Sequence, residues 1–179
     1  MKTIYLSLGS NMGDRAGNIR RAIEALGAPA SAVPGDGPIA RVVRESSLYE
    51  TEPVEMREQG WFLNCVVEAE TELMPRQLMR GLLAIERGLG RVRRVPKGPR
   101  VIDMDILLFG SSVVRAEELE IPHPRMAERR FVLVPFAEIA PGVEHPMLKK
   151  AIAELLAETG DRSEVRLWKL GSGTTDERS

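Results

Sequence analysis

Cysteine is almost absent from this chain of 179 residues, which contains only Cys65. A lone cysteine cannot build an internal disulfide framework, so the sequence indicates a reducing compartment and we expect a cytoplasmic protein. Cys65 lies in the apolar run FLNCVV, where we interpret it as a packing thiol. Long apolar runs are missing as well. No stretch approaches the roughly 18 residues of a membrane span, and MKTIYLSLGS reaches glycine and serine too early for a signal peptide.

Neither sign of charge is in excess. The chain has 25 lysines and arginines against 26 aspartates and glutamates, for a formal net charge of −1. Attraction to polyanions must therefore be local, and we expect no nucleic-acid partner and no membrane partner. Its 43% hydrophobic and 28% charged residues are typical of a soluble domain. We expect one domain over 1–170, acting as a monomer, and a polar tail over 171–179.

Hydrophobic periodicity predicts the order of the elements. Alternation predicts strands over 3–10, 41–51, 61–72 and 98–110, and helical spacing predicts helices over 14–27, from Pro75 to 88–90, and over 147–160. The order β-α-β-β-α-β matches the ferredoxin-like arrangement, an α/β (α+β) fold with an antiparallel sheet, helices on one face and C-terminal additions. Helices on one face would leave the other free to carry a site. The loop over 28–40 has no functional interpretation.

Two carboxylates interrupt the most apolar strand, GPRVIDMDILLFG. Because side chains alternate along a strand, Asp103 and Asp105 project from the same face, roughly 6–7 Å apart at the backbone, while Ile102, Met104, Ile106 and Leu108 face the core. A solvated strand face would explain a lone Asp-x-Asp. Two adjacent carboxylates repel each other unless a cation lies between them, and Mg²⁺ prefers carboxylate oxygens.

A basic loop, RVRRVPKGPR, leads directly into this strand. Its cations are suited to phosphate oxygens, and acids that hold Mg²⁺ beside cations that hold phosphates are what phosphoryl transfer requires. Gly98 and Pro99 stiffen the turn before Arg100, whose planar fork can bind a phosphate through two hydrogen bonds. A solvated loop or a nucleic-acid patch is the alternative interpretation.

Two further segments carry candidate ligand contacts. In IPHPRMAERRF, His123 lies between two prolines and Arg129 follows, a pair that could contact phosphate. His145 has no such neighbours and is assigned to the surface. In WFLN, Phe62 and Asn64 share a strand face, and a ring beside an amide can stack on a flat heterocycle and bond to its edge, although packing alone would also explain the pair. LGSN at the end of the first strand either approaches a ligand or forms a turn.

Together these segments resemble the family of 6-hydroxymethyl-7,8-dihydropterin pyrophosphokinases of folate biosynthesis. The resemblance implies a ferredoxin-like fold and a transferase that moves pyrophosphate from ATP to the pterin hydroxymethyl group and releases AMP. The matching segments follow the family order and span about 5–141: YLSLGSNMGDR, SSLYETEPV, FLNCVVEAET, AIERGLGRVR, GPRVIDMDILLFG and IPHPRMAERRFVLVPFAEIAP.

The resemblance also implies roles for individual residues. Asp103 and Asp105 would hold two Mg²⁺ ions, and together with Arg91 and Arg100 they would be the catalytic residues. The ATP site would consist of Glu86, Arg91, Arg100, Ile106, His123 and Arg129. Phe62 and Phe131 would sandwich the pterin, and its edge would be lined by Asn64, Thr51 and Val54.

The loop before the aspartate strand departs from the family pattern. The family usually has Arg-Trp-Gly-Pro-Arg there, whereas this chain has VPKGPR, with Lys97 in place of the tryptophan. The departure puts loop closure in question and leaves the aspartates in place. Two other classes of protein share some of these features. A non-catalytic binding domain would lack metal ligands, and a metal-dependent nuclease would carry a wider basic surface.

Overall fold

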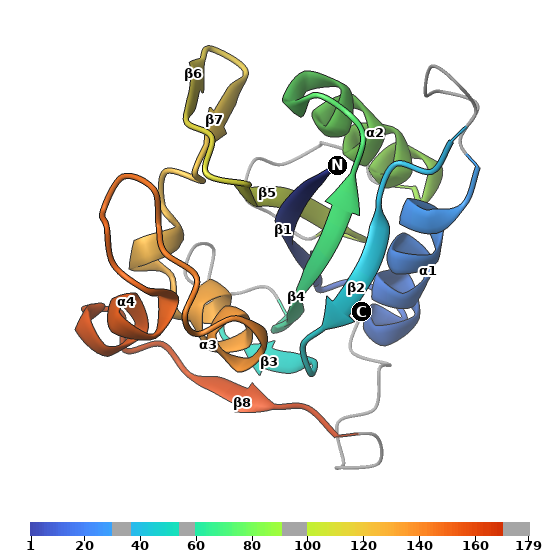
Figure 1. Ribbon diagram of the computed structural model, residues 1–179. Coiled ribbons are helices and arrows are strands. Elements are labelled where there is room, and N and C mark those ends of the chain that lie inside the picture. The colour runs from blue at the N-terminus through green and yellow to red at the C-terminus, as the bar shows by residue number, and fades with distance from the viewer. Residues whose placement is uncertain (30–36, 54–59, 91–99, 170–179) are drawn as a thin grey trace.

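The structure is a computed structural model that describes residues 1–29, 37–53, 60–90 and 100–169. Its elements follow the predicted order and continue into a C-terminal region (Figure 1). In chain order they are β1 (Lys2–Ser10), α1 (Arg15–Gly27), β2 (Arg41–Glu45), β3 (Tyr49–Thr51), β4 (Phe62–Thr71), α2 (Pro75–Gly88), β5 (Asp103–Phe109), β6 (Val114–Ala116), β7 (Leu119–Ile121), the 3-10 turn η1 (Met126–Glu128), α3 (Arg130–Ile139), α4 (Ile152–Glu158) and β8 (Val165–Leu167).

The main sheet is antiparallel and has the order β5-β1-β4-β3-β8, with β2 also paired to β4. The order β5-β1-β4-β2 is that of a ferredoxin-like fold, so the predicted fold is confirmed. The strand expected over 41–51 is divided in two. At the break, Ser46 donates its backbone N–H to the Val66 carbonyl at 2.9 Å, and its hydroxyl accepts the Val66 N–H at 2.9 Å. That hydroxyl takes the place of a backbone acceptor, so the chain can leave the ladder between β2 and β3.

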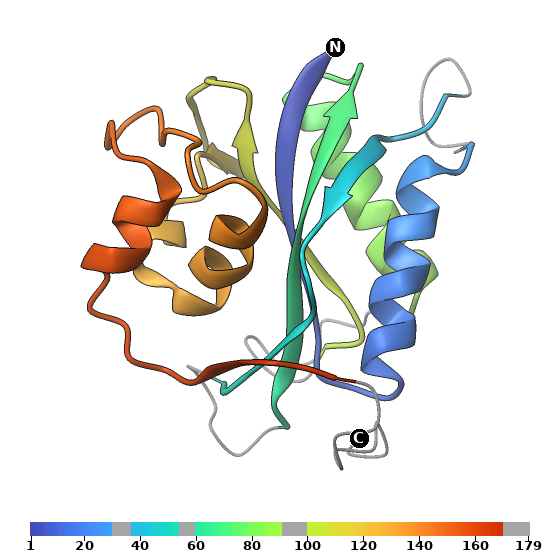
Figure 2. The ribbon, with the colours of Figure 1, turned by 60° about the horizontal axis from the view of Figure 1, so that its bottom comes forward.

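Helices α1 and α2 cover one face of the sheet, as the sequence predicts (Figure 2). Helix α1 begins after Asp14, whose carboxylate accepts the Gly17 N–H at 3.0 Å and satisfies one free donor of the first turn. Pro75 at the start of α2 costs no hydrogen bond, because a backbone N–H at this first helical position would have no acceptor within the helix. The aliphatic core between these helices and the sheet includes Ile4, Leu6, Leu8, Ile19, Leu63, Leu78, Met104 and Ile106.

The C-terminal additions cover part of the opposite face, which corrects the expectation that this face is free. Helices α3 and α4 pack there and form a second core with Tyr5, Val66 and Leu107 (Figure 2). Leu108 also belongs to this second core, not to the first as predicted. The cause is a register shift between β1 and β5: Leu6 pairs with Ile106 but Tyr5 with Leu108, so the extra residue reverses the alternation.

The C-terminal region differs most from expectation. Helix α3 was not predicted, and α4 is shorter than the predicted 147–160. His145 is buried, not on the surface as predicted. Its Nδ1 accepts hydrogen bonds from the backbone N–H groups of Met147 and Leu148 at 3.2 and 3.1 Å, so the chain turns around the ring. The predicted tail over 171–179 lies outside the described residues. None of the helices in the described part of the chain has the length and apolar sequence that a bilayer crossing needs.

Candidate active site

The two aspartates lie where β5 runs beside β1. Asp105 pairs with Ser7 and Asp103 with Gly9, so both carboxylates project from the face opposite the aliphatic core that holds Met104. Serine and glycine are small partners, and they leave room above β1. Both aspartates are only partly buried. The strand therefore presents two carboxylates side by side on an open part of the sheet.

The electrostatics of this pair favour a cation. Burial raises the pKa of Asp105 to about 7, and the negative charges of Asp103 and Glu86 act in the same direction. Arg129 and Arg100 lower it without cancelling the rise. Arg100 also donates from Nη1 to Asp103 Oδ2 at 2.9 Å. Bringing two ionised carboxylates together on this face is thus costly unless positive charge beyond these arginines is supplied.

A cleft of about 620 Å³ opens over the aspartates, between α2, β5, the β6–β7 hairpin and the segment that follows it. It brings together all the described residues that the sequence assigns to ATP. Their roles remain predictions, and Arg91 lies outside the described residues. The assigned residues in the cleft wall are Glu86, Arg100, Ile106, His123 and Arg129, with Asp103 and Asp105.

Glu86 fixes the strand that carries the aspartates. It is 3% exposed, and its Oε2 accepts the backbone N–H of Met104 at 2.8 Å. Met104 lies between the two aspartates on β5, an edge strand, and its N–H has no further strand to bond within the described part of the chain. The carboxylate satisfies that donor and holds β5 against α2. A charged hydrogen bond of this kind orients both aspartates at once.

His123 is held as a neutral hydrogen-bond donor. Its Nδ1 accepts the backbone N–H of Arg125 at 3.2 Å, which leaves the proton on Nε2. Burial lowers the pKa of His123 to about 4, and the nearby Arg129 acts in the same direction. The backbone N–H of His123 also donates to the Leu107 carbonyl at 3.0 Å and ties the segment to β5. At neutral pH the ring can therefore donate to an anion in the cleft.

The second predicted cluster lies on the same sheet face, on β3 and β4. Asn64 Nδ2 donates to Thr51 Oγ1 at 2.6 Å, and both residues are buried. Gly9 makes this possible, because a β-carbon there would lie 2.5 Å from Asn64 Oδ1. The close contact at Gly9 is with a side chain of the protein, so the approach of LGSN to a ligand remains a prediction.

Two aromatic side chains are predicted to complete this cluster. Phe62 begins β4 and is partly buried, and Phe131 lies in the first turn of α3 against the second core. The guanidinium of Arg129, a residue of the cleft wall, lies 5.5 Å from the centre of the Phe131 ring. Arg129 thus links the cleft wall to the Phe131 ring. Val54 lies outside the described residues.

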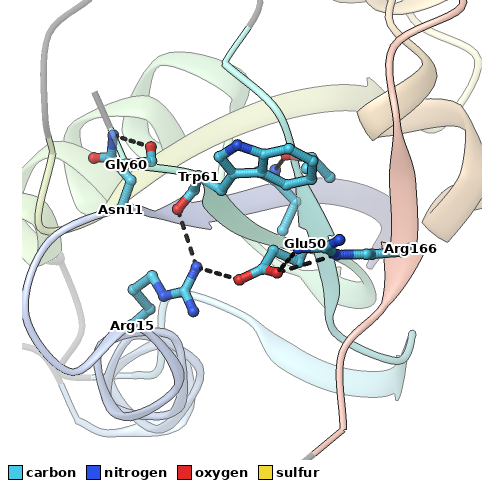
Figure 3. Close-up of polar contacts among 8 residues, drawn as sticks. Asn11, Arg15, Glu50, Gly60, Trp61 and Arg166 are labelled. Carbon is cyan, nitrogen blue, oxygen red and sulfur yellow. Dashed lines mark hydrogen bonds and ion pairs between the residues drawn. The ribbon is translucent and has the colours of Figure 1, made fainter. Parts of the chain in front are cut away.

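Three residues support these clusters: Asn11, which the sequence marks only as part of LGSN, and Arg15 and Glu50, to which it assigns no role. Asn11 Nδ2 donates to the Gly60 carbonyl at 3.2 Å (Figure 3). Its Oδ1 accepts the backbone N–H of Arg100 at 2.7 Å. It connects the residue before β5 with the residue that leads into β4. Beside it, a buried ion pair joins Arg15 and Glu50 at 2.9 Å. Their supporting contacts leave no local signal, because each joins segments distant in sequence.

Comparison with known proteins shows which family and which relatives this chain is similar to. The family model described as 7,8-dihydro-6-hydroxymethylpterin-pyrophosphokinase (HPPK) matches residues 5–141. A 2-amino-4-hydroxy-6-hydroxymethyldihydropteridine pyrophosphokinase of Bacillus subtilis is 44% identical over 172 residues, which are 96% of this chain and 93% of that protein. One of the same name from Methylorubrum extorquens is 45% identical over 87% of this chain and 94% of its own.

Longer proteins match as well. The folic acid synthesis protein fol1 of Pneumocystis carinii is 39% identical over 89% of this chain, which covers 20% of that protein. Among solved structures, an HPPK-DHPS in complex with substrates aligns with a TM-score of 0.65 at 14% identity, over 87% of this chain and 43% of its own. Plasmodium falciparum HPPK-DHPS with pteroate gives a TM-score of 0.68 at 15% identity, over 87% and 42%. At such identity the structures speak for the fold alone.

Proposed function

The chain belongs to the 7,8-dihydro-6-hydroxymethylpterin-pyrophosphokinase family, and we propose how its described residues carry out that family's reaction. The protein transfers pyrophosphate from ATP to 6-hydroxymethyl-7,8-dihydropterin, a step of folate biosynthesis. The observation that carries the site assignment is the cleft of about 620 Å³, which gathers the two aspartates, two arginines and a neutral histidine around one space, with Glu86 and three glutamates of the β6–β7 hairpin also in its wall.

The triphosphate of ATP lies in this cleft in our proposal. Arg100 and Arg129 contribute positive charge near the aspartates, and His123 donates from Nε2 to a phosphate oxygen. Arg91 is expected to add a further contact from outside the described residues. Guanidinium groups suit this task because they bind phosphate through two parallel hydrogen bonds. Ile106 and Glu86 lie in the same wall near the nucleotide.

Enzymes of this family use ATP with Mg²⁺, and we propose that Asp103 and Asp105 hold two ions. Within the described ranges no group of three or more acidic, histidine or cysteine side chains gathers to enclose a metal. Mg²⁺ is commonly bound by one or two carboxylates together with water and substrate phosphates, so an open pair fits. The raised pKa of Asp105 supports the same assignment, since a cation would relieve the repulsion. When bound, Mg²⁺ supplies positive charge for the phosphate oxygens.

The pterin is assigned to the second cluster. Phe62 and Phe131 offer rings for stacking, and Asn64, Thr51 and Val54 line the edge of the heterocycle. Because Asn64 Nδ2 donates to Thr51 Oγ1, the amide is held in one orientation before the substrate arrives. An amide fixed in this way loses little side-chain entropy when it binds the donors and acceptors of the pterin.

The chemistry is an in-line displacement at phosphorus. The hydroxymethyl oxygen of the pterin forms a bond to the β-phosphorus, the bond from that phosphorus to the α,β-bridging oxygen breaks, and AMP leaves with the bridging oxygen. The hydroxyl proton passes to solvent. Arg100, Arg129 and His123 stabilise charge on the transferring group, and the two clusters hold the reactants in line. In a loose transition state such positioning supplies much of the rate.

We propose further that the protein is a single domain over 1–170 and acts as a monomer in the cytoplasm. The buried, unpaired thiol of Cys65 is consistent with a reducing environment, and burial raises its pKa to about 12, which suits a packing role.

Incubation with ATP, Mg²⁺ and 6-hydroxymethyl-7,8-dihydropterin tests the activity. AMP and pterin diphosphate should form in equal amounts, and Asp105→Asn is the matched inactive control. Formation of ADP in place of AMP would show cleavage at the wrong phosphate and refute the proposed reaction.

A further inference from the structure

Strand β8 comes from the C-terminal part of the chain and runs beside β3 at the edge of the sheet (Figures 1 and 2). Its three residues pair one to one with β3, and the contact extends beyond the strand. Trp168 donates its backbone N–H to the Leu48 carbonyl at 2.9 Å, and the Glu164 N–H reaches Glu52 Oε1 at 2.8 Å. Strand β3, which carries Thr51, is therefore held between β4 on one side and β8 on the other.

Arg166, the middle residue of β8, makes two contacts across this edge. Its Nη2 and Nε donate to Glu50 Oε1 at 2.7 and 3.2 Å, and its guanidinium lies 4.5 Å from the centre of the Trp61 ring (Figure 3). The other oxygen of Glu50 accepts Nη1 of Arg15 at 2.9 Å, and the same nitrogen donates to the Trp61 carbonyl at 3.0 Å. Trp61 is thus held through its ring by Arg166 and through its backbone by Arg15.

This network lies directly behind the proposed pterin cluster. Glu50 precedes Thr51 on β3, and Trp61 precedes Phe62 at the start of β4, where Thr51 and Phe62 pair across the strands. Successive side chains point to opposite faces, so the network and the pterin residues occupy opposite sides of the same two strand ends. A shift of Glu50 or Trp61 would move Thr51 or Phe62 by a comparable amount.

The burial of the members separates positioning from stability. The side chain of Glu50 is 6% exposed, and that of Arg166 is 49% exposed. Loss of Arg166 would leave Glu50 paired to the buried Arg15, so the carboxylate would not become an unpaired buried charge. A half-exposed ion pair contributes little to global stability. What Arg166 alone provides is the connection between β8, Glu50 and the Trp61 ring.

We propose that Arg166 is a positioning residue for pterin recognition, and that strand β8 belongs to the apparatus that sets the pterin site. It holds the ends of β3 and β4 from behind, so that Thr51, Phe62 and Asn64 keep the spacing the heterocycle requires. The proposal rests on the pterin assignment made above. It predicts that Arg166 affects pterin affinity selectively, because the ATP cleft lies on β5, at the other edge of the sheet.

The test compares Arg166→Met with Arg41→Met. Arg41 forms a similar surface ion pair with Glu70 at 3.0 Å, on β2, and has no contact with the network. Affinity for 6-hydroxymethyl-7,8-dihydropterin is measured with Mg²⁺ and α,β-methylene ATP, whose bridge cannot be cleaved, and affinity for that analogue is measured separately. Arg166→Met should weaken pterin binding about fivefold to tenfold and raise the KM for pterin more than it lowers kcat, with ATP analogue affinity and Tm nearly unchanged. Arg41→Met should match wild type.

Unchanged pterin affinity in Arg166→Met, or equal weakening of both ligands, would overturn the proposal. If that variant does not fold, Arg166→Lys decides, because lysine keeps the charge for Glu50 but not the planar group over Trp61. It should bind pterin more weakly than wild type, and equal affinity would refute the idea. Asn64→Ala separates this result from a failure of the pterin assignment. If Asn64→Ala leaves pterin affinity unchanged, the pocket is misplaced; if it alone weakens binding, only the role of Arg166 fails.

Discussion

The two faces of the central strands β1, β4 and β5 are built in different ways. The face under α1 and α2 is aliphatic along its length and includes Leu6, Leu8 and Leu63, all fully buried. The other face changes from apolar to polar along the strands. Tyr5 and Val66 pack under α3. Further along the strands, the same face carries Ser7, Gly9, Asn64 and the two aspartates.

The contrast shows how a small domain separates stability from chemistry. The aliphatic face supplies a continuous core, so the opposite face can give up apolar burial where the ligands bind. On the polar half of that face, Asp103 and Asp105 repel each other, and Glu86 of α2 adds to the repulsion on Asp105. The rest of the fold must offset this cost in stability. Substitutions on the two faces should therefore separate activity from stability.

The largest effect is expected for Asp105→Asn on the polar face. Turnover should fall by about 10³-fold or more, roughly 4 kcal/mol, because asparagine cannot supply the charge that Mg²⁺ requires. The fold should not suffer. The substitution removes a repelled carboxylate, so Tm without Mg²⁺ should equal or exceed that of wild type. Single-turnover rates and thermal melts measure both, and near wild-type turnover at saturating Mg²⁺ would contradict the assignment.

The opposite pattern is expected for Leu6→Ala on the aliphatic face. Leu6 is fully buried, and its truncation should lower the free energy of unfolding by about 3 kcal/mol through lost transfer energy and a cavity. Turnover below the melting range should stay close to wild type. Urea titration measures the loss, with the half-exposed Val43→Ala as control. A loss of turnover in folded Leu6→Ala would mean that the two faces are not independent.

A smaller and more selective effect is expected for Asn64→Ala. The heterocycle edge would lose a hydrogen-bonding partner, at about 1–3 kcal/mol, or roughly fivefold to 150-fold in pterin affinity. ATP affinity should change little, because the cleft residues lie on other strands. Calorimetric titration of each ligand measures the two affinities. Equal weakening of ATP binding would place Asn64 outside a separate pterin pocket.

The same contrast explains which elements the sequence predicts. Helices α1 and α2 have one apolar stripe each, and β1 alternates, so their periods identify them. Helix α3, RFVLVPFAEI, is apolar on most sides and contains Pro135, so it has no helical period to recognise. The extra residue at Leu107, which turns Leu108 toward the second core, depends on pairing with β1 and leaves no local signal.

The residues of the site also differ in how far the sequence alone predicts their positions. Strand alternation alone predicts that Asp103 and Asp105 share a face, because that geometry is local. The grouping of His123 and Arg129 with them came from the family resemblance, since their approach depends on how the segment after β7 folds back. The contact between Arg166 and Glu50 joins residues 116 positions apart, and it required the three-dimensional structure.

The smallest effect concerns His123, and it should be seen only in acid. Its lowered pKa, about 4, means that the folded protein keeps the ring neutral while the unfolded chain protonates it near pH 6.5. Protonation then favours the unfolded state, so the contribution of His123 to stability is full above pH 6.5 and declines as pH falls toward 4.

The raised pKa of Asp105 changes stability in the opposite direction over a similar pH range, so the wild-type pH profile alone does not isolate the histidine. The difference in Tm between ligand-free wild type and His123→Gln removes the common contribution. The Tm of wild type minus the Tm of His123→Gln should be constant from pH 7 to 8 and should decrease as the pH falls from 6.5 to 4.

In a direct measurement, the His123 ring signals should titrate near pH 4 in NMR, with the proton on Nε2 above that pH. Titration near pH 6.5 would show that the ring is charged in mildly acidic solution and does not act as the neutral donor assigned to it.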